Sequence, residues 1–260
     1  MTPLPPSLPA LVTGASSGIG EAFATALAER GHALTLVARR GDRLERIARR
    51  LRAEHGVTVT VLIADLETEP GLAAVAGVLA AGGPWLLVNN AGFGARGAVL
   101  DIEEGWERSL IAVNVVALHR LLRAVLPGNV AAGGGGIINV ASTAAFQPMA
   151  YFATYAASKA FVLHLTEGLA EEIRGTGTRV MALCPGPVRT EFGEVAGGAE
   201  ELERMRPMDA RTCVDIALRA FNRGDVICVP GTLNHAGTMA VRLLPRFAVR
   251  RVLGVVARPR

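Results

Sequence analysis

The chain has 260 residues, of which 50% are hydrophobic and 19% are charged, so it can bury one large core and is not intrinsically disordered. Its net charge of +4 comes from scattered arginines with few aromatic residues between them, which is weak evidence for a nucleic-acid-binding surface. Three widely spaced cysteines, and five histidines without metal-ligand spacing, predict reduced thiols in a cytoplasmic protein and no metal site.

The beginning of the chain and its hydrophobic segments predict no membrane insertion. Residues 1–9 lack a basic stretch and are rich in proline, unlike a secretory signal peptide. No uninterrupted run of about 18 or more apolar residues occurs, so we expect no transmembrane helix.

Strands and helices are predicted to alternate along the chain. Short apolar runs bounded by glycine, proline or polar residues indicate strands, and longer periodic stretches indicate helices. This alternation favours a parallel sheet with helices on both faces, so we expect one doubly wound α/β domain over residues 1–260. The strands are expected at residues 8–12, 33–38, 57–64, 85–88, 137–141, 179–183 and 226–229, with helices at 21–30, 70–81, 103–126 and 209–222.

A glycine-rich turn follows the first predicted strand, in the pattern G-x-x-x-G-x-G, and a predicted helix comes directly after it. This is the context of a dinucleotide site, because the glycines let the backbone approach a pyrophosphate and the helix N-terminus faces it. The alternative is a tight turn with a purely structural role. The candidate cofactor residues on this turn are Gly14, Ser16, Ser17, Gly18, Ile19 and Gly20.

Arg39 and Arg40, at the end of the second predicted strand, indicate which dinucleotide is bound. An acid at this point would bind the adenosine ribose hydroxyls of NAD, whereas arginines suit the 2′-phosphate of NADP. We therefore expect NADP(H) to be favoured over NAD(H). The remaining arginines of the following helix are predicted to form a solvated face: Arg43, Arg46, Arg49, Arg50 and Arg52.

Further candidate residues follow the other strands. The carboxyl ends of parallel strands meet at one edge of a sheet, and ligands gather there. The residues that the alternating pattern brings to this edge are Asp65, Leu66, Asn90, Ala91, Gly92, Ser142, Pro185, Gly186, Val188 and Thr190.

Tyr155 and Lys159 lie four residues apart on a predicted helix, so their side chains share one face at about 5–6 Å. A phenol needs about 4 kcal/mol to move its pKa from 10 to 7, and an ammonium ion about 4 Å away supplies about that much. The spacing alone is a weak signal. However, Lys159 is the only lysine among 27 basic residues, and arginine cannot replace lysine where transferable protons are needed. The pair is a candidate proton-transfer site, with Ser142 placed to hold the reacting oxygen.

The predicted helix at residues 103–126 is apolar on nearly all sides, which indicates burial on more than one face and predicts a subunit interface. Asn114 lies in its middle, where asparagine is an indifferent helix former. Three interpretations of Asn114 are open: a satisfied core amide, a kink, and an amide that binds water near the lysine.

Two segments of the second half have no clear place in the sheet. Residues 191–207 show no regular period and are predicted to be a mobile segment over a substrate pocket. Residues 234–260 mix leucine, valine and phenylalanine with arginines and form a basic apolar tail. Packing on a partner subunit and peripheral contact with a membrane surface fit this tail equally well.

With these residues placed, the chain resembles the classical short-chain dehydrogenase/reductase family over about residues 8–229. Five ordered motifs carry the resemblance, and each agrees in residue type and spacing. They are the cofactor turn Thr13-Gly14-x-x-x-Gly18-x-Gly20, the adenine contact Asp65, the sheet-bracing motif Asn89-Asn90-Ala91-Gly92, the catalytic tetrad Asn114, Ser142, Tyr155 and Lys159, and the nicotinamide segment Pro185-Gly186 with Val188 and Thr190.

The resemblance implies a single Rossmann domain with a seven-stranded parallel sheet, working as a homodimer or homotetramer. It also implies hydride transfer between C4 of NADP(H) and a carbonyl or secondary alcohol carbon. By this resemblance Tyr155 is the general acid/base and Ser142 polarises the substrate oxygen. Lys159 lowers the tyrosine pKa and binds the nicotinamide ribose, while Asn114 holds a relay water. NADP-preferring members often carry a basic residue where this chain has Ser17, so the expected preference depends on Arg39 and Arg40.

Short stretches of the sequence are similar to the branch of the family that includes long-chain ketoacyl and hydroxysteroid reductases. This similarity implies an apolar ketone, a ketoacyl compound or a steroid-like substrate. The pocket for it would draw on Ser142, Phe93, Ala144, Met149 and Phe192.

Two other classes of function compete with an enzyme. A non-catalytic NADP-binding regulator or scaffold would be favoured by loss of Tyr155, Lys159 or Ser142, and none of them is lost. A nucleic-acid binder is suggested by net charge alone. The complete tetrad favours the enzyme.

Overall fold

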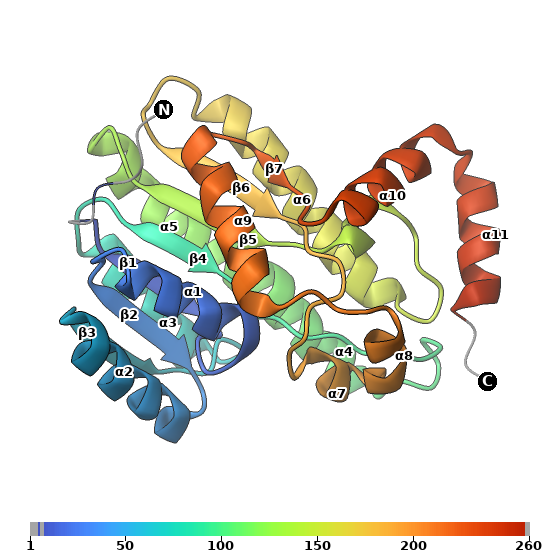
Figure 1. Cartoon of the computed structure of the whole chain (residues 1–260), viewed down its shortest axis with the longest axis horizontal. Coiled ribbons are helices and arrows are strands. Elements are labelled where there is room, and N and C mark those ends of the chain that lie inside the picture. Colours follow the sequence, from blue (N-terminus) through green and yellow to red (C-terminus); the bar gives the residue numbers. More distant parts are fainter. Residues whose placement is uncertain (1–4, 6–7, 258–260) are drawn as a thin grey trace.

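The computed structural model describes Pro5 and residues 8–257, and its centre is a seven-stranded parallel sheet in the order β3-β2-β1-β4-β5-β6-β7 (Figure 1). The doubly wound α/β prediction is confirmed, and each strand lies within about two residues of its predicted ends. Most of the proline-rich segment 1–9 lies outside the described residues. The strands are β1 Ala10–Thr13, β2 Leu34–Ala38, β3 Val59–Ile63, β4 Leu86–Asn89, β5 Gly136–Val140, β6 Arg179–Leu183 and β7 Ile227–Cys228.

Helices cover both faces of the sheet and form two separate apolar cores with it. One core lies under α1, α2 and α9, and the other lies under α3, α5 and α6 (Figure 1). In α2 the buried residues recur every three or four positions, which turns one stripe of an otherwise charged helix to the sheet. The helices are α1 Gly18–Ala28, α2 Gly41–His55, α9 Ala210–Arg223, α3 Glu69–Ala80, α5 Leu118–Ala131 and α6 Ala153–Glu172.

The sheet order creates one switch point, between β1 and β4. Chain connections run outward from β1 to β2 and β3, and the chain then returns to place β4 on the other side of β1. The loops after β1 and β4 therefore leave in opposite directions, and in open α/β sheets the crevice that binds ligands lies at this point, outside the carboxyl ends of the strands. This crevice is where the predicted cofactor residues meet.

The long apolar helix differs from its prediction. It consists of α4 Glu104–Ile111, a π-helical stretch Ala112–Ala117, and α5, so it runs on to Ala131 and is interrupted in its middle. By length and composition alone the segment Glu104–Ala131 could cross a membrane, since its most apolar window has a mean hydropathy of 1.6. The segment packs against α3, α6 and the sheet, as a core helix of a folded domain does.

The two C-terminal segments are helical. Within 191–207 the chain forms α7 Phe192–Ala196 and α8 Ala199–Arg204. Helices this short show no recognisable period in sequence, and the mobility expected for this segment stays a prediction. The tail forms α10 Thr232–Leu243 and α11 Arg246–Val256 at the end of the molecule beyond β7 (Figure 1), and its last three residues, 258–260, lie outside the described part.

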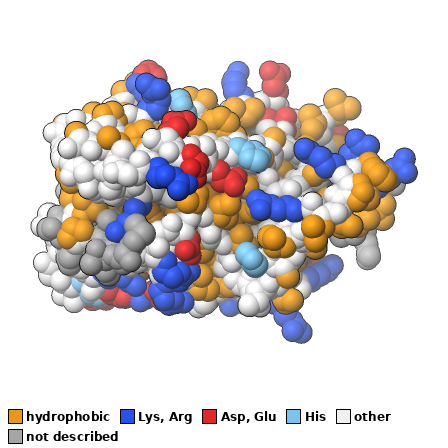
Figure 2. Space-filling model, turned by 90° about the horizontal axis from the view of Figure 1, so that it is seen from above, with side chains coloured by type: hydrophobic (Ala, Val, Ile, Leu, Met, Phe, Trp, Pro, Cys, Tyr) orange, Lys and Arg blue, Asp and Glu red, His pale blue; other side chains and the backbone are white. Residues whose placement is uncertain are grey.

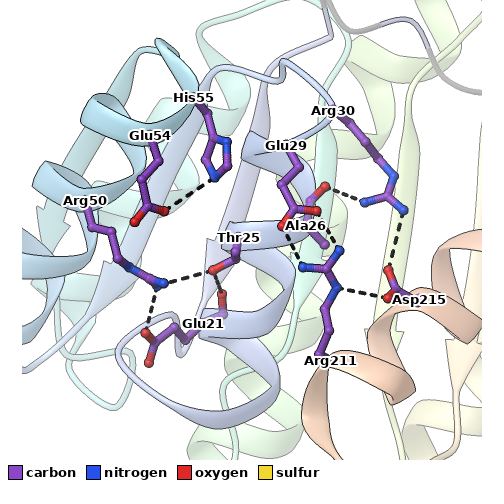
Figure 3. Close-up of polar contacts among 10 residues, drawn as sticks. All are labelled: Glu21, Thr25, Ala26, Glu29, Arg30, Arg50, Glu54, His55, Arg211 and Asp215. Atoms are coloured by element: carbon purple, nitrogen blue, oxygen red, sulfur yellow. Dashed lines mark hydrogen bonds and ion pairs between the residues drawn. The ribbon is translucent and has the colours of Figure 1, made fainter.

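A polar network joins α1, α2 and α9 on the outer surface (Figure 3). Arg211 of α9 donates to both carboxylate oxygens of Glu29 at 2.6 Å and to Asp215 at 2.9 Å. Arg50 of α2 donates to Glu21 at 3.0 Å and is exposed, in agreement with its predicted place on a solvated face. A groove of about 340 Å³ lies between these helices, and the opposite charges around it are paired.

Candidate active site

The glycine turn after β1 has the tight geometry that its spacing predicts. Gly14 and Gly18 adopt φ values of +65° and +57°, which favour glycine. A Cβ on Gly20 would collide with the carbonyl oxygen of Gly14, so the helix α1 could not begin this close to the strand with a larger residue. The turn brings the first amides of α1 to the edge of the crevice, where they suit an anion.

The loop after β4 is bonded directly to this turn. The side-chain amide of Asn90 donates to the carbonyl oxygen of Thr13 at 2.8 Å and to that of Gly14 at 3.3 Å. The Thr13 hydroxyl in turn accepts from the amides of Asn90 and Ala91, each at 3.0 Å. Asn89, one residue earlier, donates to Asn139 of β5 at 3.1 Å. The motif thus ties three neighbouring strands together at their carboxyl ends.

Arg40 reaches back over the glycine turn. Its guanidinium donates to the hydroxyl of Ser16 at 3.0 Å and to that of Ser17 at 2.8 Å, and it forms an ion pair with Glu191 at 2.7 Å. The guanidinium of Arg40 therefore places a positive charge beside Ser17, although the residue at position 17 is not itself basic. Arg39 is more exposed and lies 3.8 Å from the carboxylate of Asp65.

Arg43 belongs to the same cluster, which corrects its predicted place on a solvated face. Its guanidinium forms a second ion pair with Glu191. Glu191 lies far away in sequence, beyond β6, and sequence periodicity contains no signal for such a contact. The cluster of Arg40, Arg43 and Glu191 is called the arginine cluster below.

Tyr155 and Lys159 lie one turn apart on α6, and both side chains are buried. The Lys159 Nζ atom is 5.7 Å from the centre of the Tyr155 ring and donates to the carbonyl oxygen of Val140 at 2.9 Å. Ser142 follows β5, and its hydroxyl accepts from the amide of Ala144 at 3.1 Å and is hydrogen-bonded to Tyr155. The three predicted residues therefore meet at one point. Tyr151, the other tyrosine, lies in the turn before α6.

The pKa of Tyr155 differs from the sequence-based expectation. Burial raises this pKa to about 12, although the hydrogen bond with Ser142 lowers it in part. Burial also lowers the pKa of Lys159 to about 8. Removing water disfavours the charged form of both groups, and burial is the largest cause of each shift.

Asn114 is fully buried in the π-helical stretch, and its side chain braces the loop after β4. Its Oδ1 atom accepts from the amide of Phe93 at 3.1 Å, and its Nδ2 atom donates to the Phe93 carbonyl oxygen and to the Ser158 hydroxyl, each at 3.0 Å. Both amide hydrogens are used, which corresponds to the satisfied core amide among the three interpretations. A Cβ on Gly92 would lie 2.8 Å from Asn114 Oδ1 and 3.2 Å from Lys159 Nζ, so only glycine fits between them.

The predicted substrate residues form one apolar cluster against Tyr155. Phe93, Ala144, Met149 and Phe192 all belong to it, and the Phe192 ring lies 5.3 Å from that of Tyr155. Sequence reasoning missed Phe152, whose ring is nearer still at 4.5 Å. Its position three residues before Tyr155 was an available signal, because residues at that spacing share a helix face.

The segment after β6 closes the far side of the crevice. The amide of Thr143 donates to the carbonyl oxygen of Pro185 at 2.9 Å, which joins this segment to the Ser142 loop. A Cβ on Gly186 would touch the side chain of Asn234 of α10, a neighbour that the sequence did not indicate. Val188 and Leu66 have buried side chains that pack in the two cores, so only their main chains are available to a ligand.

The residues present fit a phosphorylated dinucleotide. The glycine turn has no side chain in the way, and Gly18 approaches Thr190 so closely that a Cβ would lie 2.8 Å from its methyl group. Beside the turn, two serine hydroxyls and the guanidinium of Arg40 converge, and this is the donor set that binds phosphate. The described residues contain no group of three or more His, Cys, Asp or Glu side chains that could hold a metal ion.

Comparisons with known proteins agree with this geometry. A family model described as short chain dehydrogenase matches residues 9–200. A short-chain dehydrogenase from Sphingobium yanoikuyae, solved in complex with NADPH, is 37% identical with a TM-score of 0.85, over 97% of this chain and 96% of that chain. A bulky-bulky ketone specific alcohol dehydrogenase from Comamonas testosteroni is 34% identical with a TM-score of 0.79, over 92% of this chain and 96% of that chain.

Similar structures also include one with the other nicotinamide cofactor. A short-chain dehydrogenase/reductase from Burkholderia phymatum, in complex with NAD, is 26% identical with a TM-score of 0.80, over 91% of this chain and 92% of that chain.

Proposed function

Since the chain belongs to the short-chain dehydrogenase family, we propose that it is an NADPH-dependent reductase of apolar ketones, with Tyr155 as the proton donor. The observation that carries the proposal is the meeting of Tyr155, Ser142 and Lys159 beside an apolar cluster, at the same sheet edge as a phosphate-binding donor set.

The cofactor site extends along the carboxyl edge of the sheet. The glycine turn (Gly14, Ser16, Ser17, Gly18, Ile19 and Gly20) binds the pyrophosphate, Arg39 and Arg40 bind the 2′-phosphate, and Asp65 with Leu66 contacts the adenine. Asn90, Ala91 and Gly92 with Lys159 hold the nicotinamide ribose. Pro185, Gly186, Val188 and Thr190 hold the nicotinamide amide. NADPH, when bound, supplies the hydride.

In the direction of reduction, Tyr155 transfers the proton to the substrate oxygen. A tyrosine with a pKa of about 12 keeps its proton at pH 7, so the side chain is ready to donate it when negative charge develops on the substrate oxygen. Ser142 holds that oxygen through its hydroxyl. Lys159, with a pKa of about 8, is mostly charged at pH 7 and stabilises the tyrosinate that remains.

Asn114 acts as a positioning residue. Its three hydrogen bonds hold Phe93 and Ser158, and the π-helical turn around it departs from the regular backbone bonding of the helix. Such turns frequently occur at functional sites. A relay water in this region would be bound by the main chain beside Asn114, because both hydrogens of its side-chain amide are already used.

The substrate is an apolar ketone, with ketoacyl and steroid-like compounds as the classes to test first. The supporting observation is that the rings of Phe152 and Phe192 and the side chains of Phe93 and Met149 surround Tyr155. An apolar ligand that covered these partly buried side chains would remove their remaining apolar surface from water, which favours binding.

The protein works in the cytoplasm as a homodimer or homotetramer. Large apolar side chains are exposed along α4, the π-helical stretch and α6, at Trp106, Ile111, Val116 and Phe161. A second copy of the chain that covers this face would bury them, which is the favourable term in most protein association.

The tail helices α10 and α11 make a peripheral contact with an anionic membrane surface. Leu233, Leu243, Phe247 and Val255 are exposed by 62–88%, and Figure 2 shows hydrophobic and arginine side chains next to each other at this end of the molecule. The sequence of the two helices contains arginines and no acidic residue, so the charge complements anionic lipid and repels a second copy of the same face. Sedimentation with vesicles of anionic and of neutral lipid tests this contact.

A titration of the purified protein with NADPH and with NADH tests the proposed function, followed by NADPH oxidation with bulky apolar ketones. Tight binding of NADPH, weak binding of NADH and turnover of a ketone are expected. NADPH binding without turnover of any carbonyl compound would make the chain a non-catalytic NADP-binding protein. Weak binding of both cofactors would leave the glycine turn with a structural role only.

A further inference from the structure

Glu191 occupies a position that the proposed reaction does not explain. It lies between Thr190 and the first residue of α7, and its carboxylate is paired with both Arg40 and Arg43. These two arginines come from the β2–α2 region, on the other side of the glycine turn. The side chain of Glu191 therefore spans the crevice in which the cofactor is proposed to bind.

The carboxylate of Glu191 is an anion of the protein itself, and it occupies arginine donors that are suited to a bound anion. The hydrogen bonds from Arg40 and Arg43 hold the pKa of Glu191 at about 2, so this carboxylate is charged at any working pH. The same Arg40 also donates to Ser16 and Ser17. Guanidinium and hydroxyl donors around one point would serve a phosphate monoester equally well.

The chain on either side of Glu191 links the two ends of the crevice. On one side Thr190 lies against Gly18 at the beginning of α1. On the other side Phe192 places its ring 5.3 Å from the ring of Tyr155. Movement of the Glu191 backbone would therefore shift both Thr190, which lies against Gly18, and Phe192, which packs against Tyr155.

We propose that Glu191 is a specificity-determining residue, which competes with the 2′-phosphate of the cofactor for Arg40 and Arg43. This inference rests on the proposed binding of NADP(H). A 2′-phosphorylated nucleotide exchanges with the Glu191 carboxylate and releases the segment of residues 190–196, whereas a nucleotide without this phosphate leaves the two ion pairs intact. Recognition of the adenosine end is thereby transmitted to Phe192 in the substrate pocket.

Two cofactor fragments separate this idea from effects at the nicotinamide. Adenosine 2′,5′-bisphosphate carries the 2′-phosphate and 5′-AMP does not, and neither contains nicotinamide. Glu191→Gln removes the competing charge and keeps the shape of the side chain, while Glu194→Gln removes the same charge from an exposed position of α7. Calorimetric titration gives the dissociation constant for each pair.

Glu191→Gln is expected to bind adenosine 2′,5′-bisphosphate about fivefold more tightly than the unchanged chain, since two exposed ion pairs no longer have to be broken. The affinity for 5′-AMP is expected to stay the same, as is every affinity of Glu194→Gln. An unchanged affinity of Glu191→Gln for the bisphosphate would overturn the proposal. An equal gain for 5′-AMP would do so too, because the effect would then be independent of the 2′-phosphate.

Hydrogen exchange of the unchanged chain gives a second readout that needs no variant. Adenosine 2′,5′-bisphosphate is expected to accelerate exchange of the α7 amides, such as that of Val195, which donates to the Glu191 carbonyl oxygen. No acceleration is expected with 5′-AMP. Slower exchange of these amides with the bisphosphate would overturn the release of the segment.

The two proposals fail in different ways. Tight NADPH binding with no effect of Glu191→Gln would remove only the role of Glu191. Failure of NADPH, NADH and the bisphosphate to bind would remove the proposed function together with the competition that rests on it.

Discussion

Two groups of ionisable residues define this site, and their surroundings favour the neutral form in one group and the charged form in the other. Tyr155 and Lys159 are buried, and burial drives both towards the neutral form, with pKa values of about 12 and about 8. The arginine cluster is partly exposed, and ion pairing drives its acid towards the charged form, with the pKa of Glu191 at about 2. The first group is governed by desolvation and the second by attraction.

The difference assigns the two groups to different tasks. Because burial favours the neutral form of Tyr155 and of Lys159, their protonation can change when a reacting oxygen binds, which suits the pair for proton transfer. A permanently charged cluster on the surface does not change its protonation, but it can exchange one anion for another. Removing the Tyr155 hydroxyl should therefore leave anion binding by the arginine cluster intact.

The largest expected effect comes from the buried pair. Tyr155→Phe removes the hydroxyl that donates the proton, and we expect turnover to fall by about 1000-fold or more. The dissociation constant for NADPH should stay within about twofold, because the ring remains packed against Phe152. Steady-state rates with a ketone and a cofactor titration check both expectations. Tyr151→Phe is the matched control, and turnover retained by Tyr155→Phe would remove this residue from the mechanism.

The next effect comes from the arginines that face the adenosine end. Arg39→Ala combined with Arg40→Ala should weaken NADPH about 100-fold, since charge-assisted bonds to a phosphate contribute about 1.5 kcal/mol each. NADH should be nearly unaffected. Arg46→Ala combined with Arg49→Ala removes the same charge from exposed positions of α2 and should change neither cofactor. Equal losses for NADPH and NADH would mean that Arg39 and Arg40 do not recognise the 2′-phosphate.

A higher salt concentration should weaken anion binding by the exposed arginine cluster and should leave the pKa of the buried Tyr155 unchanged. Raising the ionic strength from about 0.05 to about 0.5 M shortens the screening length severalfold, and we expect NADPH to bind about tenfold more weakly. The pKa of Tyr155, followed by absorbance of the phenolate, should not move. If NADH weakened by the same factor as NADPH, the salt effect would have to be assigned to the pyrophosphate shared by both cofactors.

The smallest effect is a stability change with pH that belongs to Lys159. Its folded pKa of about 8 lies below the ordinary value of 10.5, so above pH 8 the unfolded chain holds a proton that the folded chain has lost. Stability contributed by this residue therefore rises with pH. Relative to Lys159→Met, the chain should gain about 1 kcal/mol in unfolding free energy between pH 7 and pH 9. Urea denaturation of both proteins at each pH measures the difference. A constant difference would show that Lys159 keeps an ordinary pKa.

The sequence alone determined the seven strands in their order along the chain and the residues that gather at the sheet edge, but it did not indicate the helices α7, α8, α10 and α11. Strand periodicity, the glycine turn and the Tyr155–Lys159 spacing are local patterns, since each depends on residues within one or two turns of the chain. The alternation of strands and helices then restricts the fold to a parallel sheet. In such a sheet the carboxyl ends of the strands must meet, and for this reason local patterns are sufficient to predict that Ser142 and Tyr155 approach each other.

Only the tertiary structure decided the contacts between residues that are far apart in sequence. Glu191 reaches Arg40 and Arg43 across the glycine turn, and Asn234 lies against Gly186, although no local pattern connects them. The protonation of Tyr155 and Lys159 also depended on the whole fold. Desolvation is a property of everything packed around a side chain, so a spacing of four residues predicts that two groups meet but not how far their surroundings shift each pKa.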